Sequence, residues 1–279
     1  MELNVKSNDT IYNYLRNNLD GKSKNNIKTL LKNGLISVNG KVITKYDYPI
    51  KINDIIIVSD GYTENDITLK IIYEDDNIIV IDKPTKILTI GNKKEKDNTL
   101  YRKVSDYLKK EKKKVFIIHR LDFDTSGVIM FAKNQKIQKL YQDNWNNIAK
   151  KREYVAVVEG ITLPKGHIES YLKTSKTLEV YSSKNKDGLF AITDYEMIGH
   201  NNKFSLLRIL ISTGRRNQIR CHMSDIGHPI LGDKKYKSMH NPIDRLCLHA
   251  SILKVEDPLT HKLFTFRSNI PNEFNSIIK

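Results

Sequence analysis

The chain has 279 residues, and its 47 lysines and arginines against 32 aspartates and glutamates give a formal net charge of +15. This basic balance predicts a polyanionic partner, and we expect nucleic acid. The only cysteines are Cys221 and Cys247, which argues against a disulfide framework or a cysteine-ligated zinc site. No stretch is long and apolar enough to span a membrane, so we expect a cytoplasmic protein without a membrane partner.

Residues 1–60 have a pattern of their own. Apolar residues recur at helical spacing from Ile11 to Leu19, and a second helix begins near Ser23 and stops at Gly34. Asn39-Gly40 lies between two short β-branched runs and predicts a tight hairpin, after which a further apolar strand closes the unit. Lysines on or just before the second helix could face phosphates, although such lysines usually form a solvated face. The candidates for RNA contact here are Lys22, Lys24 and Lys28.

This segment resembles the small αL-type RNA-binding module first known from a small-subunit ribosomal protein. The resemblance depends on four features, in chain order: Gly21-x-Ser23, Ile27-x-x-Leu30-x-x-x-Gly34, Val38-Asn39-Gly40-Lys41 and an apolar strand after Asn53-Asp54. It implies an RNA-binding domain at residues 1–60, tethered to a larger second domain.

A polar sequence, His119-Arg120-Leu121-Asp122-Phe123-Asp124-Thr125-Ser126-Gly127, lies between two apolar runs that are typical of buried strands. Polar groups on a turn between rigid strands are well placed for chemistry. Arg120 supplies a positive charge beside Asp122, which favours the ionised carboxylate and predicts a nucleophile or a base. A turn that only joins two strands and stabilises itself accounts for the same residues about equally well.

A strand, a glycine turn and a helix follow one another between residues 206 and 226, and the turn and first helical turns carry Arg215, Arg216 and Arg220. Arginines at a helix N-terminus attract anions, whether phosphate or carboxylate. The rest of the chain alternates strands with occasional helices and has no internal repeat. This pattern predicts an α+β domain around a large sheet, joined to the first domain by a polar linker at residues 60–66.

Five motifs between residues 70 and 270 occur in one order, which makes chance coincidence negligible. They are Val80-Ile81-Asp82-Lys83-Pro84, His119-Arg120-Leu121-Asp122-x-x-Thr125-Ser126-Gly127, Lys151-x-x-Tyr154-x-Ala156-x-Val158-x-Gly160, Thr213-Gly214-Arg215-x-x-Gln218-Ile219-Arg220-x-His222 and Gly227-His228-Pro229-Ile230-Leu231-Gly232-Asp233. Together they resemble the RluA-type RNA pseudouridine synthases, several of which carry the same N-terminal module. The resemblance implies a large mixed, mainly antiparallel sheet at residues 68–279. It also implies an enzyme that isomerises uridine in structured RNA without a metal or cofactor.

The resemblance further implies roles for individual residues. Asp122 matches the family's catalytic aspartate, which acts as nucleophile or base. Arg220 matches the basic residue that pairs with this aspartate and keeps it ionised. Tyr154 matches the tyrosine that stacks on the target base and could move the proton from carbon five. Ile219 is expected to line the pocket beneath the base.

Further residues are expected to contact RNA. His119 and Arg120 would contact a phosphate or brace the loop, and Arg120 could fill the gap left by a target nucleotide that leaves its stack. Arg215, Gln218 and His222 complete the candidates. Large-subunit ribosomal RNA is the favoured substrate and transfer RNA the second. We expect a monomer with no obligate protein partner.

The chain departs from the family pattern at three places. Arg216-Asn217 replaces a common Thr-His, which leaves the role of that histidine unfilled. The glycine that often follows Lys-Pro is replaced by the Lys86-Ile87 region, which leaves the geometry of that loop open. Asp124 lies at a variable position and is interpreted as a surface carboxylate, with tuning of the pKa of Asp122 as the alternative.

Other interpretations fit some of the same residues. A hydrolase could use Asp122 and Asp124 as an acid–base pair if the loop held them about 5 Å apart or more. A metal site could combine these carboxylates with His119. A protein kinase is excluded, because the glycine-rich loop and the Asp-Phe-Gly motif are missing. A ribosome-assembly protein without catalysis fits the charge, although the presence of Asp122, Tyr154 and Arg220 argues against lost activity.

Overall fold

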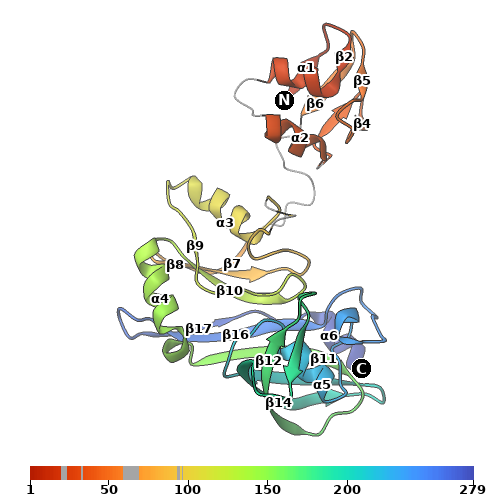
Figure 1. Ribbon diagram of the computed structural model, residues 1–279. Helices are drawn as coiled ribbons and strands as arrows, with labels where there is room; N and C mark the ends of the chain where they lie inside the picture. The colour runs from red at the N-terminus through yellow and green to blue at the C-terminus, as the bar shows by residue number, and fades with distance from the viewer. Residues whose placement is uncertain (20–23, 33, 59–68, 93–94, 96) are drawn as a thin grey trace. The chain divides into compact units, whose positions relative to one another are not determined.

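The computed structural model describes residues 1–19, 24–32, 34–58, 69–92, 95 and 97–279 (Figure 1). Internal contacts divide the chain into two units, Met1–Thr68 and Leu69–Lys279. The linker predicted at residues 60–66 lies outside the described residues.

The smaller unit contains the two predicted helices and the predicted hairpin. Thr10 caps the first helix, because its side chain accepts a hydrogen bond from the backbone N–H of Asn13. Asn39 and Gly40 both have positive φ, 51° and 80°, as a tight hairpin turn requires. The bounds are β1 (Glu2–Asn4), β2 (Asp9–Thr10), α1 (Ile11–Asn18), α2 (Lys24–Lys32), β3 (Ile36–Val38), β4 (Lys41–Val42), β5 (Pro49–Ile50) and β6 (Ile55–Val58).

Strands of this unit form a sheet in the order β1-β6-β3-β4, and β2 pairs with β5. The apolar faces of both helices pack on the sheet residues, and Ile11, Leu15, Ile27 and Ile56 are fully buried. The sequence analysis missed β1, because three residues with one apolar side chain give no periodicity to read.

Eleven strands of the larger unit form one sheet among the described residues. The central order is β13-β12-β14-β15-β11-β16-β10-β8-β7, with β17 beside β16 and β9 beside β10. All pairs are antiparallel except β10 with β16, which confirms the predicted mixed, mainly antiparallel α+β fold. The bounds are β7 (Lys70–Glu74), β8 (Ile78–Lys83), β9 (Phe116–Ile117), β10 (Ser126–Ala132), β11 (Lys151–Glu159), β12 (Lys165–Thr174), β13 (Val180–Ser183), β14 (Leu189–His200), β15 (Phe204–Ile211), β16 (Leu248–Glu256) and β17 (Leu263–Arg267).

Helices cover two apolar parts of this sheet (Figure 1). Ile137 and Tyr141 of α4 pack into one cluster with Val128 and Met130 of β10. Helices α5 and α6 contribute to a second cluster around β11 and β15. The bounds are α3 (Leu100–Lys109), α4 (Gln135–Ile148), α5 (Gln218–Asp225), the short 3-10 helix η1 (Lys234–Tyr236) and α6 (Asn272–Ile278).

Strand β10 begins at Ser126, two residues before the apolar run that predicts it. Gly127 explains the extension. It has φ 110°, and a Cβ there would lie 2.2 Å from the carbonyl oxygen of Ala250 on β16. Only glycine allows this approach, which joins β10 to β16 in parallel. The turn that carries Asp122 therefore leads into a strand inside the large sheet, between β8 and β16.

Candidate active site

The loop from Leu121 to Thr125 is held through its backbone. The N–H of Thr125 donates to the carbonyl of Asp122 (3.2 Å), which closes the turn. The Nζ atom of Lys83 donates to the carbonyls of Phe123 (3.2 Å) and Thr125 (2.6 Å), and also to that of Pro84 (3.0 Å). These bonds use every proton of an ammonium group, so Lys83 ties the end of β8 to the loop.

Two threonines complete this support. The hydroxyl of Thr85 donates to the carbonyl of Asp124 (2.8 Å). The hydroxyl of Thr89 donates to the carbonyl of Leu121 (2.8 Å) and accepts from the N–H of the same residue (3.2 Å). Every residue of the loop 121–125 except Asp122 is thus bonded through its backbone to a side chain of residues 83–89. The sequence analysis placed Lys83 in its first motif but assigned no role to Lys83, Thr85 or Thr89, although a lysine that ends an apolar strand was a usable signal.

Lys86 lies in the same segment, at the place where the family often has glycine. Its φ is 59°, in the left-handed region that glycine adopts readily. Its Nζ atom lies 3.0 Å from a carboxylate oxygen of Asp244. The departure from the family pattern therefore keeps a backbone conformation suited to glycine.

The carboxyl group of Asp122 has no hydrogen bond or ion pair with any described residue. Burial raises its pKa, and this outweighs the positive charges of Arg220, Arg216, Lys83 and Arg120, which act in the opposite direction. In the protein alone, burial therefore works against the ionised form that the sequence analysis expects. Arginine charges do surround Asp122, but they offset part of the cost of burial and do not exceed it.

Tyr154 lies on β11 and packs against the cluster that contains Ile219. Burial raises the pKa of its phenol to about 12, against the lowering effect of the charge on Arg152. The charge of Asp122 adds an increase that is smaller than the effect of Arg152. The phenol is therefore protonated at neutral pH, and Asp122 is near enough to act on it electrostatically.

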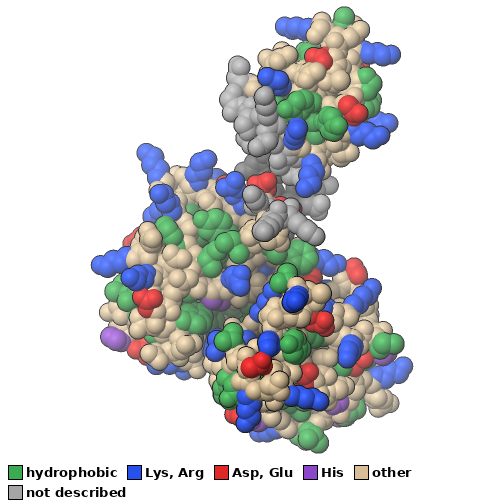
Figure 2. All heavy atoms as spheres, viewed as in Figure 1, with side chains coloured by type: hydrophobic (Ala, Val, Ile, Leu, Met, Phe, Trp, Pro, Cys, Tyr) green, Lys and Arg blue, Asp and Glu red, His purple; other side chains and the backbone are tan. Residues whose placement is uncertain are grey.

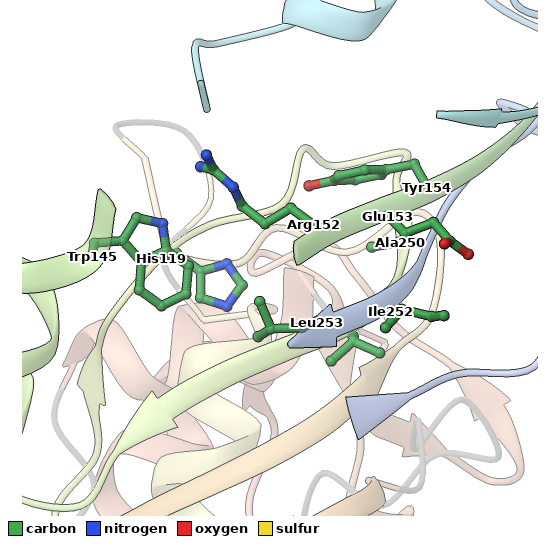
Figure 3. Close-up of a pocket in the computed structure, with 9 residues that line it drawn as sticks. His119, Trp145, Arg152, Glu153, Tyr154, Ala250, Ile252 and Leu253 are labelled. Atoms are coloured by element: carbon green, nitrogen blue, oxygen red, sulfur yellow. The ribbon is translucent and has the colours of Figure 1, made fainter. Parts of the chain in front are cut away.

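A small pocket adjoins Tyr154 (Figure 3). Arg152 extends between Tyr154 and the stacked rings of His119 and Trp145 (Figure 3). An Nη atom of Arg152 donates to the carbonyl of Ser212, whereas its Nε atom is buried without a partner among the described residues. A Cβ on Gly214 would lie 3.0 Å from this guanidinium. Arg152 thus links β11 to the turn before α5, a role that sequence reasoning missed.

His119 braces the loop. Its Nε2 atom accepts a hydrogen bond from the N–H of Met130 (3.1 Å), and its ring stacks on Trp145 with centroids 4.8 Å apart. Burial lowers the pKa of His119 to about 3, assisted by the charge of Arg152. A neutral ring whose Nε2 lone pair is occupied fits the bracing alternative better than a phosphate contact.

Arg220 has a different partner from the one expected. Its Nε and Nη2 atoms each lie 2.7 Å from a carboxylate oxygen of Asp233, in a bidentate pair. Burial works against the charge of Arg220, but the bonds to Asp233 raise its pKa overall. The direct pairing with Asp122 that the resemblance implies is therefore wrong for this structure. Arg220 acts on Asp122 through its charge only.

Comparison with known proteins follows the same division of the chain. Residues 77–225 match the RNA pseudouridylate synthase family, and residues 19–56 match the S4 domain. The chain belongs to the RNA pseudouridylate synthase family. Membership confirms the resemblance of the five motifs and makes the protein an isomerase of the pseudouridine synthase type.

Curated relatives agree with this assignment, and a solved structure shares the fold. The chain is 31% identical over 273 residues to "Ribosomal large subunit pseudouridine synthase D" of Vibrio cholerae, covering 90% of this chain and 84% of the relative. The protein of the same name in Haemophilus ducreyi is 29% identical over 279 residues, covering 92% and 86%. Human "RNA Pseudouridylate Synthase Domain Containing 1" shares the fold, with a TM-score of 0.60 and 22% identity over 72% of this chain and 83% of that one.

Two of the RNA contacts expected for this pseudouridine synthase are used inside the protein. Gln218 is buried, and its amide donates to the carbonyl of Ile192 and to Thr193 while accepting from Thr213 and the N–H of Arg215. His222 is fully buried between the hydroxyls of Ser170 and Thr193, at 2.9 Å each, and burial lowers its pKa to about 4. RNA contact is therefore the wrong expectation for both residues, because their polar atoms already have partners.

Other expected contacts are accessible in this synthase. Arg120, Arg215 and Arg216 are exposed, and Arg215 is fixed by a bond from its Nε atom to the carbonyl of Phe190 (3.0 Å). Ile219 is buried in the same apolar cluster against which Tyr154 packs. Asn217 has φ 50° and donates to the hydroxyl of Tyr236 (3.2 Å), so this departure supports the turn before α5. Asp124 is half-buried and acts on Lys83, with no resolved effect on the pKa of Asp122.

The lysines of the S4 domain are only partly described. Lys22 and the side chain of Lys24 lie outside the described residues. Lys28 is exposed, with its Nζ atom 5.6 Å from the ring centroid of Tyr12. Lysine and arginine side chains are spread over the visible faces of both units (Figure 2).

The described part of the chain holds no group of three or more histidine, cysteine, aspartate or glutamate residues that could bind a metal ion. His119, Asp122 and Asp124 therefore do not form such a group. Among the described residues, no helix has the length and hydropathy needed to cross a membrane.

Proposed function

We propose that this enzyme converts specific uridines of large-subunit ribosomal RNA to pseudouridine. The observation that carries the proposal is the similarity to relatives named for the ribosomal large subunit, which extends over both units and 90% of the chain. The exposed arginines around the Asp122 loop and the net charge of +15 suit a large polyanion. Transfer RNA is the alternative substrate.

Asp122 is proposed as the catalytic carboxylate. The reaction breaks the bond between C1′ of the ribose and N1 of uracil, turns the base, and joins C1′ to C5. The C5 proton is lost and N1 gains one, so the product is an isomer and no oxidant or reductant takes part. Asp122 suits this role because its carboxylate is available while the backbone around it is fixed by Lys83, Thr85 and Thr89.

Tyr154 is proposed to stack on the base that leaves the RNA stack, with its phenol kept neutral. Its raised pKa favours a hydrogen-bonding phenol over a phenolate base. Arg220 is proposed to act as a positioning charge, fixed by Asp233 at a distance from Asp122. Arg120 is proposed to occupy the space left by the flipped nucleotide, because it is exposed and has no partner among the described residues.

The S4 domain is proposed as a tethered RNA-binding domain, to which Lys22, Lys24 and Lys28 contribute. Deletion of residues 1–60 should weaken RNA binding and reduce its salt dependence, because fewer phosphates would be neutralised. Affinity measured at several salt concentrations tests this, with circular dichroism as the check on folding. If the full chain and the deletion variant bind RNA with equal affinity at every salt concentration, the S4 domain does not contribute to RNA binding. We also expect the enzyme to act in the cytoplasm as a monomer.

The experiment that tests the proposed function is pseudouridine mapping of total RNA from cells with and without the gene. A third strain carries Asp122→Asn, which keeps the shape of the side chain but cannot become an anion. We expect a large-subunit ribosomal RNA site that is absent from the deletion strain, restored by the native gene and not restored by the variant.

Each other outcome is informative. A site lost from transfer RNA instead would overturn the ribosomal substrate but keep the activity. Restoration of the site by Asp122→Asn would remove Asp122 from the chemistry. No change at any site would leave the ribosomal proposal without support.

A further inference from the structure

Three aromatic side chains lie on adjacent strands at one end of the large sheet. Tyr171 on β12 is directly opposite Phe190 on β14, and their ring centroids are 5.2 Å apart. Tyr181 on β13 is paired with Lys173 of β12. Lys173 is two residues from Tyr171, so Tyr171 and Tyr181 lie on the same face of the sheet. Tyr181 is 43% exposed and Phe190 36% exposed. We call Tyr171, Tyr181 and Phe190 the aromatic face.

The aromatic face is not required by the core. Alternate residues of the same strands, Leu172, Val180 and Ala191, are buried on the opposite side with Cys221 and Tyr236. The core of this corner is therefore complete without the aromatic side chains. A group of exposed aromatic rings on neighbouring strands is typical of a surface that binds a partner and is not needed for folding.

Positive charge borders the aromatic face. Segment 171–190 contains four lysines against one glutamate and one aspartate. The aspartate, Asp187, is paired with Lys173 and also accepts from Ser183. The other lysines are exposed and have no ion pair with a described residue: Lys176, Lys184 and Lys186.

The strand that carries Phe190 is bonded to the turn before α5. Phe190 accepts through its carbonyl from Nε of Arg215 (3.0 Å). Two residues along β14, the N–H of Ile192 donates to Thr213 (2.9 Å). The charge of Arg215 in turn acts on Arg152, beside Tyr154. Strand register places Tyr154 on the sheet face of Ala191, opposite the aromatic face, so an RNA strand reaches the rings by passing the end of β14 at Arg215.

We infer that the aromatic face binds unpaired nucleotides of the RNA, beyond Arg215 from the catalytic centre, by stacking their bases on Tyr181 and Phe190. Bases of single-stranded RNA stack on exposed aromatic rings, and nearby lysines neutralise the phosphates between them. The lysines argue against a second copy of this chain as the occupant, because pairing two such faces would bring like charges together. The inference rests on the family's action on RNA but not on the ribosomal substrate.

The test uses the full chain and synthetic RNA. The probes are a single-stranded 12-nucleotide RNA of mixed sequence with one 2-aminopurine at successive positions, and the same RNA in a duplex. Tyr181→Ala and Phe190→Ala are the test variants. Tyr181→Phe keeps the ring, and Leu163→Ala and Leu259→Ala remove exposed apolar side chains elsewhere in the same unit.

We expect each ring deletion to weaken binding of the single strand by about 5- to 100-fold, the range measured for loss of one stacked base. The quenching of 2-aminopurine at one or two positions should disappear with it. Tyr181→Phe and both leucine variants should bind as the native protein does, and duplex binding should change by less than about twofold. If Phe190→Ala does not fold, Tyr181→Ala alone decides.

Three results would overturn the inference. The first is unchanged single-strand affinity and quenching in Tyr181→Ala. The second is an equal loss of affinity in the leucine controls. The third is a dimer in sedimentation that dissociates in Tyr181→Ala, which would make the face a protein interface. None of these depends on which RNA the enzyme modifies, so the ribosomal proposal stands or falls separately.

Discussion

Two polar segments of the larger unit meet near Tyr154 and are built in opposite ways. In the loop 121–125, backbone carbonyls are held by Lys83, Thr85 and Thr89, and the carboxylate of Asp122 has no partner among the described residues. In the segment 213–222, the side chains themselves are held, as for Gln218 and His222. The first arrangement presents a reactive group, whereas the second fixes a helix.

The comparison shows that the polar residues of the five motifs have two different uses. A group that must react with substrate has to remain free of partners inside the protein. Asp122 is such a group, and the energetic cost of burying its carboxylate raises its pKa. A group that builds the site gains most when every donor and acceptor is satisfied. Arg220 belongs to the second kind, because Asp233 takes both of its facing donors.

The largest expected effect comes from Asp233→Asn. Asp233 is 2% exposed, and its loss of charge would leave Arg220 buried without a counter-ion. We expect unfolding free energy to fall by about 3–5 kcal/mol, as for other buried pairs that lose one partner. Urea unfolding measures this change. Asp244→Asn is the control, since its pair with Lys86 is exposed and should contribute far less to stability. Equal losses would show that Arg220 is not held by Asp233.

Lys83→Met should have the next largest effect. It leaves the carbonyls of Phe123 and Thr125 without the donor that fixes them, at a cost of about 3 kcal/mol. Because the loop carries Asp122, the turnover number should fall more than RNA affinity does. Lys70→Met, which removes an exposed lysine beside the same strand, is the matched control. Native turnover in Lys83→Met would mean that the loop holds its shape without the lysine.

His222 should make the fold sensitive to acid. Its folded pKa of about 4 lies below the ordinary 6.5, so the unfolded chain takes up the proton first as the pH falls. Its contribution is complete above pH 6.5 and is lost between 6.5 and 4, by about 2 kcal/mol at pH 5.

Urea unfolding at pH 7 and pH 5 tests this contribution. His222→Gln should lose about 2 kcal/mol less than the native protein between the two values. His200→Gln, at an exposed position, should behave as the native protein does. The prediction fails if both variants show the same acid loss.

The smallest effect on stability is expected for Arg216→Gln, since Arg216 is exposed and changes of this kind stay within about 0.5 kcal/mol. Its charge lowers the pKa of Asp122, so the variant should raise that pKa further. In the pH profile of kcat/KM, the acid limb should therefore move to higher pH. Arg215→Gln should leave the limb in place, because its charge has no resolved effect on Asp122. If the acid limbs of the two variants coincide, the charge of Arg216 has no effect on the pKa of Asp122.

The sequence by itself determined the family, the mixed sheet and most elements of the smaller unit. Helical spacing from Ile11 to Leu19 and the turn at Asn39-Gly40 are local signals, and local backbone preferences decide such elements. Motif order identified Asp122 and Tyr154 as candidates without any knowledge of their surroundings. The exposed arginines of the Asp122 loop and the turn before α5 were also within reach of this reasoning.

Only the tertiary structure decided which polar residues are already bonded. Arg220 pairs with Asp233 across 13 positions, His222 with Ser170 across 52, and Lys83 with Thr125 across 42. A sequence motif gives residue types and spacing but not the partner that folding brings to each donor. The aromatic face is of the same kind, since Tyr171 and Phe190 become neighbours only through the pairing of β12 with β14. In each case the partner comes from another part of the chain, so it is decided by how the elements pack and not by the spacing within one motif.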